Sequence, residues 1–152
     1  MIIKGPWGNP TVRKKVVSSI LDKVAPFADG FNKLRLHDAI PFAYIGKTSE
    51  KNKKYRLKQH RDLLKKYELK YGPFTILDMM KSPRYTFCAD KIHFVYQTLD
   101  LDEIYLAEYD LIEHFKKKRP YHVNLAPGGG GAPGSPPYYI YVITQRWVNL
   151  GY

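Results

Sequence analysis

Apolar residues recur every three or four positions after Asn9 and Pro10, where a capping residue precedes a proline. Proline is favoured at the first helical position, because its missing N–H would have no partner there. The pattern therefore predicts an amphipathic helix over Pro10–Val24, closed by Pro26 and Gly30. Its basic outer face is typical of a solvated surface.

The same spacing returns in Leu101–Lys116, which follows the capping residues Thr98 and Asp100 and ends before Pro120. The buried stripe of this second predicted helix comprises Leu101, Ile104, Tyr105, Leu111, Ile112 and Phe115. Glu108 occupies the next position of that stripe. A carboxylate is therefore expected in the middle of an apolar face.

A third predicted helix, Lys51–Tyr71, ends at a glycine followed by a proline. Its buried stripe is expected to contain Leu63, Leu64, Tyr67 and Tyr71. Towards the N-terminus this stripe continues into His60 and Arg56, which are four residues apart and share one face. The face thus changes from apolar to cationic along the helix.

Alternating and β-branched positions predict strands, and glycine and proline mark the loops. The expected elements are a strand ending in Tyr44-Ile45-Gly46, two strands Tyr85–Phe87 and Ile92–Gln97 around a turn at residues 89–91, a strand Tyr138–Thr144, a short helix Phe74–Met80 and a loop over residues 125–137. We expect one domain over residues 1–152, in which residues 1–33 form an N-terminal helical extension.

Composition adds a strong positive charge. The 152 residues include 25 Lys and Arg against 14 Asp and Glu, a formal net charge of +11. A small basic domain favours a polyanionic partner, most often nucleic acid. The single cysteine, Cys88, excludes an intramolecular disulfide, and no signal-peptide pattern or long apolar run is present. We expect a cytoplasmic protein that does not span a membrane.

The polar residues on the two buried stripes suggest a reaction at phosphate. A buried carboxylate is usually paired, protonated or bound to a metal, and Arg can neutralise the charge of a phosphate under attack. Two simpler explanations remain open, an Arg56–Glu108 ion pair and a core histidine at position 60. The chain has no glycine-rich nucleotide loop ending in Gly-Lys-Ser/Thr, and no nucleophilic Ser or Cys is indicated.

The order of these residues resembles the GIY-YIG nucleases. The matching positions are Tyr44-Ile45-Gly46-Lys47-Thr48, then Arg56 and His60 on a basic helix, Glu108, and Asn124 before a glycine run. The resemblance implies an α+β fold, with a small three-stranded antiparallel sheet flanked by helices and, here, an extra N-terminal helix. It also implies DNA cleavage with one divalent metal ion, Mg²⁺ or Mn²⁺, in a bacterial or phage-infected host cell.

The resemblance also implies roles for the matching residues. Tyr44 would place a hydroxyl near the attacking water, Arg56 would bind the phosphate, and His60 would transfer a proton or hydrogen-bond. Glu108 would bind the metal, and Asn124 would orient the site.

One strand of the family pattern is missing, because no tyrosine precedes Tyr44. The best substitute is Tyr139-Ile140-Tyr141, near the other end of the chain. We therefore expect Tyr139–Ile143 to pair with the strand of Tyr44 and to make Tyr141 catalytic, by circular permutation or by strand swapping in a homodimer. Alternatively, this segment is only an aromatic edge strand.

The sequence thus predicts a metal-dependent endonuclease that acts on double-stranded DNA by in-line attack of water. The expected nucleic-acid contacts are Lys47, Lys53, Lys54, Lys58 and Arg61. Two alternatives remain: a catalytically inactive DNA- or RNA-binding module of the same fold, and an RNA-associated basic protein. An inward-facing Glu108 favours the enzyme, since a carboxylate would only repel a bound nucleic acid.

Overall fold

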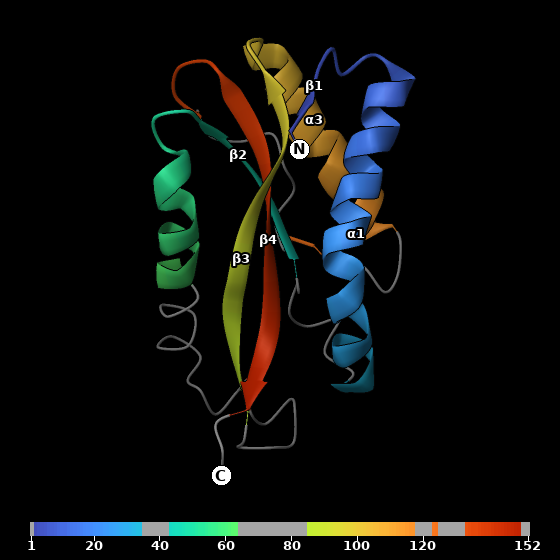
Figure 1. The fold of residues 1–152 in the computed structure, drawn as a ribbon, viewed down its shortest axis with the longest axis vertical. Helices are drawn as coiled ribbons and strands as arrows, with labels where there is room; N and C mark the ends of the chain where they lie inside the picture. The colour runs from blue at the N-terminus through green and yellow to red at the C-terminus, as the bar shows by residue number, and fades with distance from the viewer. Residues whose placement is uncertain (1, 35–42, 64–84, 118–122, 125–132, 150–152) are drawn as a thin grey trace.

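The computed structural model describes residues 2–34, 43–63, 85–117, 123–124 and 133–149. It is an α+β structure with one four-stranded sheet in the order β1-β3-β4-β2 (Figure 1). The elements are β1 (Ile3–Lys4), α1 (Pro10–Leu34), β2 (Ala43–Ser49), the 3₁₀ helix η1 (Lys53–Tyr55) with helical residues 56–63 directly after it, β3 (Tyr85–Thr98), α3 (Leu101–Lys116) and β4 (Tyr138–Asn149).

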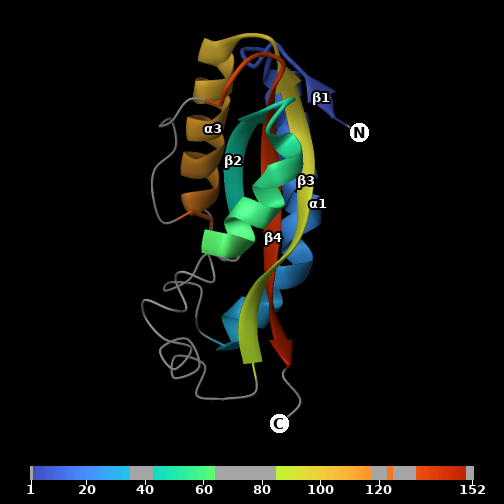
Figure 2. The same cartoon turned by 90° about the vertical axis from the view of Figure 1, so that its left-hand side faces the viewer.

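Helices cover both faces of the sheet. Helices α1 and α3 lie on one face, and helical residues 56–63 lie on the other (Figures 1 and 2). Because side chains alternate along a strand, each strand supplies both layers. On β4, Ile140 and Val142 pack with α1 and α3, whereas Tyr141 and Ile143 pack with Leu57 of the opposite helix.

Strand β4 lies at the centre of the sheet and pairs antiparallel with both β2 and β3. Tyr44 lies opposite Ile143, and Gly46 lies opposite Tyr141. This register confirms the predicted pairing of Tyr139–Ile143 with the strand of Tyr44, and it shows that the pairing forms within one chain. The alternative of a simple edge strand is wrong.

The sheet has one strand more than the three antiparallel strands that were expected. A fourth, short strand, β1, pairs parallel with β3, with Ile3 opposite Tyr96. The residues after β1 are held by a hydrogen bond from the Trp7 backbone N–H to Glu103 Oε1 (2.6 Å). Sequence alternation could not reveal β1, because it contains only two residues.

Strand β3 is one continuous strand, so the predicted turn at residues 89–91 is wrong. The ladder with β4 shifts register between Ala89 and Lys91, which marks a β-bulge rather than a reversal. Asp90 lies at this bulge, and its carboxylate forms an ion pair with Arg146, with Oδ1 2.7 Å from Nε. A polar residue between two apolar segments therefore bends the strand without ending it. Its partner β4 likewise continues to Asn149, beyond the predicted end at Thr144.

Helix α1 begins where the sequence predicted, with Asn9 Oδ1 accepting a hydrogen bond from the Thr11 N–H (2.9 Å). It does not end at Pro26 or Gly30, because it continues to Leu34. A proline inside a helix removes one backbone hydrogen bond. Packing compensates for that loss, since Phe27, one residue after the proline, lies against the core.

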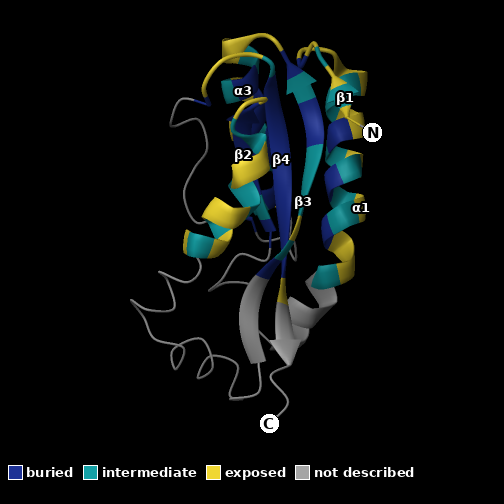
Figure 3. Cartoon of the chain, turned by 60° about the vertical axis from the view of Figure 1, so that its left-hand side comes forward, coloured by how far each residue is buried: buried dark blue, intermediate teal, exposed yellow. Residues whose placement is uncertain are grey.

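The N-terminal helix α1 packs into the hydrophobic core. Val16, Ile20 and Val24 are fully buried against the sheet and α3. Figure 3 shows buried segments along α1. Arg13 also joins the two helices, donating from Nε to Asp110 Oδ2 at 2.6 Å. Removing α1 would therefore expose the face of the sheet that it covers.

Helix α3 has the predicted bounds. The Asp100 side chain accepts hydrogen bonds from the backbone N–H groups of Asp102 and Glu103 at the first turn. The predicted buried stripe is correct for Ile104, Leu111, Ile112 and Phe115, all of which are buried. Tyr105 is half-buried, and Leu101, the first residue of the helix, is 42% exposed.

The predicted helix Lys51–Tyr71 is described only as far as residue 63. Leu63 is 59% exposed, so its expected place in the buried stripe is wrong. The inward face instead carries Leu57 and His60. The predictions for Leu64, Tyr67 and Tyr71, for the short helix Phe74–Met80 and for residues 125–132 lie outside the described residues. Within the described residues, no helix has the length and apolar character needed to cross a membrane.

Candidate active site

Two tyrosines from neighbouring strands define the centre of the candidate site. The ring centroids of Tyr44 on β2 and Tyr141 on β4 lie 6.2 Å apart, and their hydroxyl groups interact through a hydrogen bond. Tyr139 lies on the same face of the sheet, as strand alternation predicts. Its ring packs edge to face on Phe94, with ring centroids 5.9 Å apart. The strand pairing therefore gathers an aromatic cluster under helical residues 56–63.

Neither central tyrosine is prepared to ionise. Burial raises the pKa of Tyr44, the charge of Glu108 raises it further, and Arg56 lowers it by less. The pKa of Tyr141 is raised for the same leading reason, burial. The opposing effect of Arg56 is smaller than that of burial, so the pKa of each tyrosine stays above its ordinary value. Both hydroxyls stay protonated at pH 7.

Arg56 begins the helical segment directly after η1 and lies against the sheet. Its Nε donates to Thr48 Oγ1 at 2.9 Å, and one terminal nitrogen donates to Gln59 Oε1 at 3.1 Å. The Thr48 contact fixes the plane of the guanidinium from the sheet side. The charge of Arg56 lowers the pKa of both Tyr44 and Tyr141, so it acts on the same place as their hydroxyls.

His60 lies one turn further along the same helix and packs on Tyr44, with ring centroids 4.7 Å apart. Its Nε2 lies 2.8 Å from Oε1 of Gln145, which projects from β4. Burial lowers the pKa of His60, and the hydrogen bond that His60 donates to Gln145 raises it by less. His60 is therefore the site's neutral, proton-accepting group at pH 7.

Glu108 is buried in the middle of α3, as the sequence predicted, and is 7% exposed. Its Oε1 receives Lys47 Nζ at 2.7 Å. Lys47 is itself buried and lies over the ring of Tyr105, 4.8 Å from the centroid. Lys47 is therefore the cationic partner of Glu108 and is not exposed to solvent. The simpler explanation of an Arg56–Glu108 ion pair is wrong, because the ion pair of Glu108 is formed with Lys47.

The predicted residues lie on two faces of the sheet. Lys47 and Glu108 belong to the layer of α3, whereas Tyr44, Tyr141 and Arg56 belong to the layer of helical residues 56–63. Strand β2 is the outermost strand on this side of the sheet, so groups from both layers can act at its edge. Glu108 does so electrostatically, because it raises the pKa of both tyrosines.

Asn124 holds the edge of β2. Its Oδ1 accepts the Ile45 N–H at 2.8 Å, and its Nδ2 donates to the Ile45 carbonyl at 2.9 Å. The neighbouring Val123 forms a parallel bridge with Ala43. Asn124 itself has φ of 28°, a left-handed conformation that Asn tolerates better than most residues. This amide therefore positions the strand that carries Tyr44 and Lys47.

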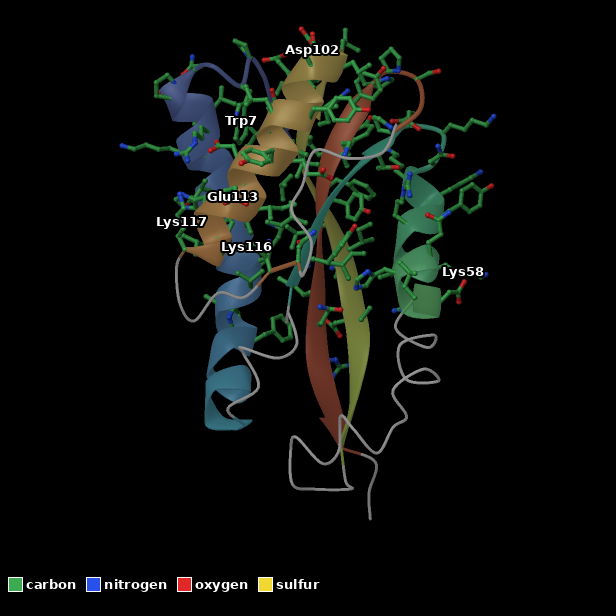
Figure 4. All side chains as sticks on the ribbon, turned by 180° about the vertical axis from the view of Figure 1, so that it is seen from behind. Trp7, Lys58, Asp102, Glu113, Lys116 and Lys117 are labelled. Carbon is green, nitrogen blue, oxygen red and sulfur yellow. The ribbon has the colours of Figure 1, made fainter. Side chains whose placement is uncertain are left out.

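The remaining predicted nucleic-acid contacts differ in exposure. Lys54, Lys58 and Arg61 are exposed, and Lys58 points outward from its helix (Figure 4). Lys53 is more constrained, because its Nζ pairs with Glu50 Oε1 at 3.1 Å and lies 4.7 Å from the ring centroid of Tyr139. Tyr139 also donates a hydrogen bond to Glu50. The exposed cations thus lie on the helix that covers the tyrosines.

Two site residues were not identified from the sequence. Gln145 contacts His60 and Thr48 contacts Arg56 through their side chains. Both lie on strands, at alternate positions from a tyrosine of the cluster: Thr48 is four residues after Tyr44, and Gln145 is four after Tyr141. A polar residue that continues a buried strand face was the available signal.

The metal ligand predicted from the sequence is Glu108. Mg²⁺ typically binds one or two carboxylates and keeps several waters and substrate phosphate oxygens as its other ligands. Glu108 supplies one such carboxylate, buried on the α3 face of the sheet, where its charge acts on the Tyr44 hydroxyl from the opposite layer. Across the described residues, no group of three His, Cys, Asp or Glu side chains could hold a metal ion. One carboxylate is within the number that Mg²⁺ usually takes from a protein, and it is fewer than the four protein ligands of a structural zinc site.

No family model matches the chain, and no curated protein or solved structure matches it either.

Proposed function

We propose that the chain is a metal-dependent endonuclease that hydrolyses phosphodiester bonds of double-stranded DNA. The observation that supports this most is the pairing of β2 with β4, which brings Tyr44 and Tyr141 together beneath Arg56 and His60. The ordered motif resemblance to GIY-YIG nucleases and the net charge of +11 point the same way. In this proposal β4 replaces the strand that precedes Tyr44 in the family order.

The scissile phosphate would lie against Arg56. Arg56 Nε donates a hydrogen bond to Thr48, and one terminal nitrogen donates to Gln59. The other N–H groups of the planar guanidinium would donate to phosphate oxygens. Tyr141 donates its hydroxyl proton to Tyr44, and Tyr44, held neutral by burial, donates a hydrogen bond to the developing negative charge. Preorganised donors of this kind stabilise the transition state because they need no reorientation during the reaction.

His60 would accept the proton of the attacking water. Because burial lowers its pKa, the ring stays neutral and able to accept a proton at pH 7. A tyrosinate base is disfavoured by the raised pKa of both tyrosines. The structure therefore favours His60 over Tyr44 as the base among the chain's own groups.

Glu108 would hold Mg²⁺ or Mn²⁺. When bound, such an ion polarises phosphate oxygens and stabilises the leaving group. Lys47 would neutralise Glu108 in the absence of an ion, which explains how a carboxylate can be buried there.

The Lys47–Glu108 ion pair also favours a second function, which is the binding of DNA or RNA without cleavage. A carboxylate neutralised by Lys47 at 2.7 Å needs no metal to be stable. The exposed cations of helical residues 56–63 would then bind phosphates without any reaction.

Supercoiled plasmid incubated with the protein and Mg²⁺, with and without EDTA, tests the proposal directly. We expect nicked and linear products with Mg²⁺ and none with EDTA. Glu108→Gln should abolish cleavage and leave DNA binding unchanged or tighter, because it removes one negative charge and keeps the shape. Cleavage by Glu108→Gln at the wild-type rate would overturn the role of Glu108, and DNA binding without cleavage would support the second function.

The role of Tyr141 has a matched control on the surface. Tyr141→Phe should slow cleavage, since it removes one buried hydroxyl and little volume. Tyr109→Phe makes the same change at a residue that is 49% exposed on α3 and should leave the rate unchanged. Equal rates for both variants would remove Tyr141 from the mechanism.

A further inference from the structure

Gln145 is a buried polar residue with no place in the reaction described above. It lies on the central strand β4 and is 1% exposed. Its side chain projects to the face that carries the aromatic cluster, where Oε1 lies 2.8 Å from His60 Nε2. Burying an amide costs free energy unless its groups are hydrogen-bonded, so the contact constrains both partners.

The geometry points to Gln145 as the residue that positions His60: it fixes the ring as the Nε2–H tautomer and so makes Nδ1 the atom that accepts a proton. An amide oxygen is only an acceptor, so the histidine nitrogen facing it must be the protonated one. In a neutral imidazole the other nitrogen then carries the lone pair. This inference deepens the proposed function and rests on it for the role of His60 in catalysis.

A second contact fixes the same ring. The Tyr44 ring packs on His60 with centroids 4.7 Å apart and planes 34° apart, which limits rotation of the imidazole about its side-chain bonds. Tyr44 comes from β2 and Gln145 from β4, so two neighbouring strands hold one side chain of the covering helix. Packing alone leaves the two ring tautomers unresolved, and Gln145 distinguishes them.

The tautomer can be measured without any activity. In ¹⁵N-histidine-labelled full-length protein, ring nitrogen shifts distinguish protonated from unprotonated nitrogens, and His60→Gln identifies the His60 signals among the five histidines. We expect wild type to show a protonated Nε2 and an unprotonated Nδ1. Gln145→Met should give a mixture of tautomers. Gln97→Met, the same change at a glutamine on β3 opposite Tyr139, should leave the His60 signals unchanged.

Gln145→Glu provides a conservative variant that covers a failure of Gln145→Met to fold. The carboxylate still accepts from Nε2, so the tautomer is retained, and its negative charge favours the protonated ring. Arg56, one turn before His60 on the same helix, carries its charge in the wild type and in the variant alike, so the new carboxylate is the change in charge at His60. We expect the acid limb of the single-turnover cleavage rate to move to higher pH in Gln145→Glu and not in Gln97→Glu.

The two readouts separate the inference from the proposed function. An unprotonated Nε2 in the wild-type protein, or a His60 tautomer unchanged in Gln145→Met, overturns the positioning role. The predicted tautomer in a protein that never cleaves DNA supports the positioning role and overturns the nuclease proposal instead. Cleavage with an acid limb unmoved in Gln145→Glu overturns the link between the two.

Discussion

Gly46 lies opposite Tyr141 in the β2–β4 ladder, and the Tyr141 ring covers the place where a Cβ of residue 46 would be. The ring is 4% exposed and lies between Tyr44 and Phe94, with centroids at 6.2 Å and 6.3 Å, so it has little room to move aside. A glycine in the middle of a strand usually weakens it. Here the missing side chain provides the space for an aromatic ring from the central strand.

Gly46→Ala should therefore lower the free energy of unfolding by about 1–3 kcal/mol, the usual cost of overpacking, and should also slow cleavage because Tyr141 is displaced. Gly8→Ala is the matched control. A Cβ at Gly8 meets no atom within 4 Å, and its stability should be close to that of wild type. Urea unfolding of the three proteins measures the difference. Equal midpoints for Gly46→Ala and Gly8→Ala would contradict the packing argument.

Arg56→Ala should reduce the single-turnover cleavage rate by roughly 10²-fold or more at saturating DNA, as expected for loss of a group that stabilises the transition state. Arg56→Lys should rescue little, because one ammonium cannot both bind Thr48 and present a planar fork to phosphate. Lys58→Ala, on the exposed side of the same helix, serves as the control. If Arg56→Ala weakened only binding, Arg56 would be an ordinary phosphate contact.

The Lys47–Glu108 pair should show strong thermodynamic coupling. Breaking a buried ion pair from one side typically costs about 3–5 kcal/mol, because the other charge remains buried, whereas replacing both partners costs much less. We therefore expect Glu108→Gln and Lys47→Met each to be destabilised and the double variant to recover much of the loss. The same cycle on the exposed pair Lys58–Asp62 (3.4 Å) should give coupling near zero. Additive effects at Lys47 and Glu108 would contradict the 2.7 Å contact.

The depressed pKa of His60 predicts a loss of stability in acid. The unfolded chain takes up a proton near the usual pKa of about 6.5, whereas folded His60 resists protonation until a lower pH. Stability from this group is therefore complete above that range and is lost as the pH falls towards the folded pKa. The difference in unfolding free energy between wild type and His60→Gln should narrow on acidification. His93→Gln leaves His60 in place, so this variant should keep the loss of stability in acid that His60 causes. If the difference in unfolding free energy between wild type and His60→Gln did not change with pH, the burial of a neutral His60 ring would be contradicted.

The sequence predicted the parts of the structure in which one face of an element is uniformly apolar. Helix α3 and the burial of Glu108 follow from a stripe of residues spaced three and four apart. The pairing of β2 with β4 followed because one aromatic, β-branched segment was available to complete the sheet. In each case local pattern and tertiary packing favour the same structure.

The errors occur where tertiary contacts override the local pattern. Asp90 is a residue type typical of turns, but β3 pairs with β4 both before and after Asp90, and this pairing keeps β3 extended through a bulge. Pro26 looks like a helix end, but packing of Phe27 keeps α1 helical. The partners of Lys47 and Gln145, which are Glu108 and His60, come from distant segments, and no spacing rule could indicate that they approach each other.

Salt should weaken DNA binding in a way that separates exposed cations from buried ones. Each phosphate that a cation neutralises releases counterions and contributes about 0.9 to the slope of log affinity against log salt concentration. Lys58, whose side chain is 81% exposed, should be one such contact, so Lys58→Ala should reduce the slope by about 1. Lys47 is buried against Glu108, so the double variant Lys47→Met/Glu108→Gln, which keeps the net charge, should leave the slope unchanged. Fluorescence anisotropy of labelled duplex DNA between about 50 and 200 mM salt measures all three slopes. A flat dependence for wild type would show that nucleic acid is not the partner, and an equal fall in slope for both variants would show that Lys47 reaches the phosphates after all.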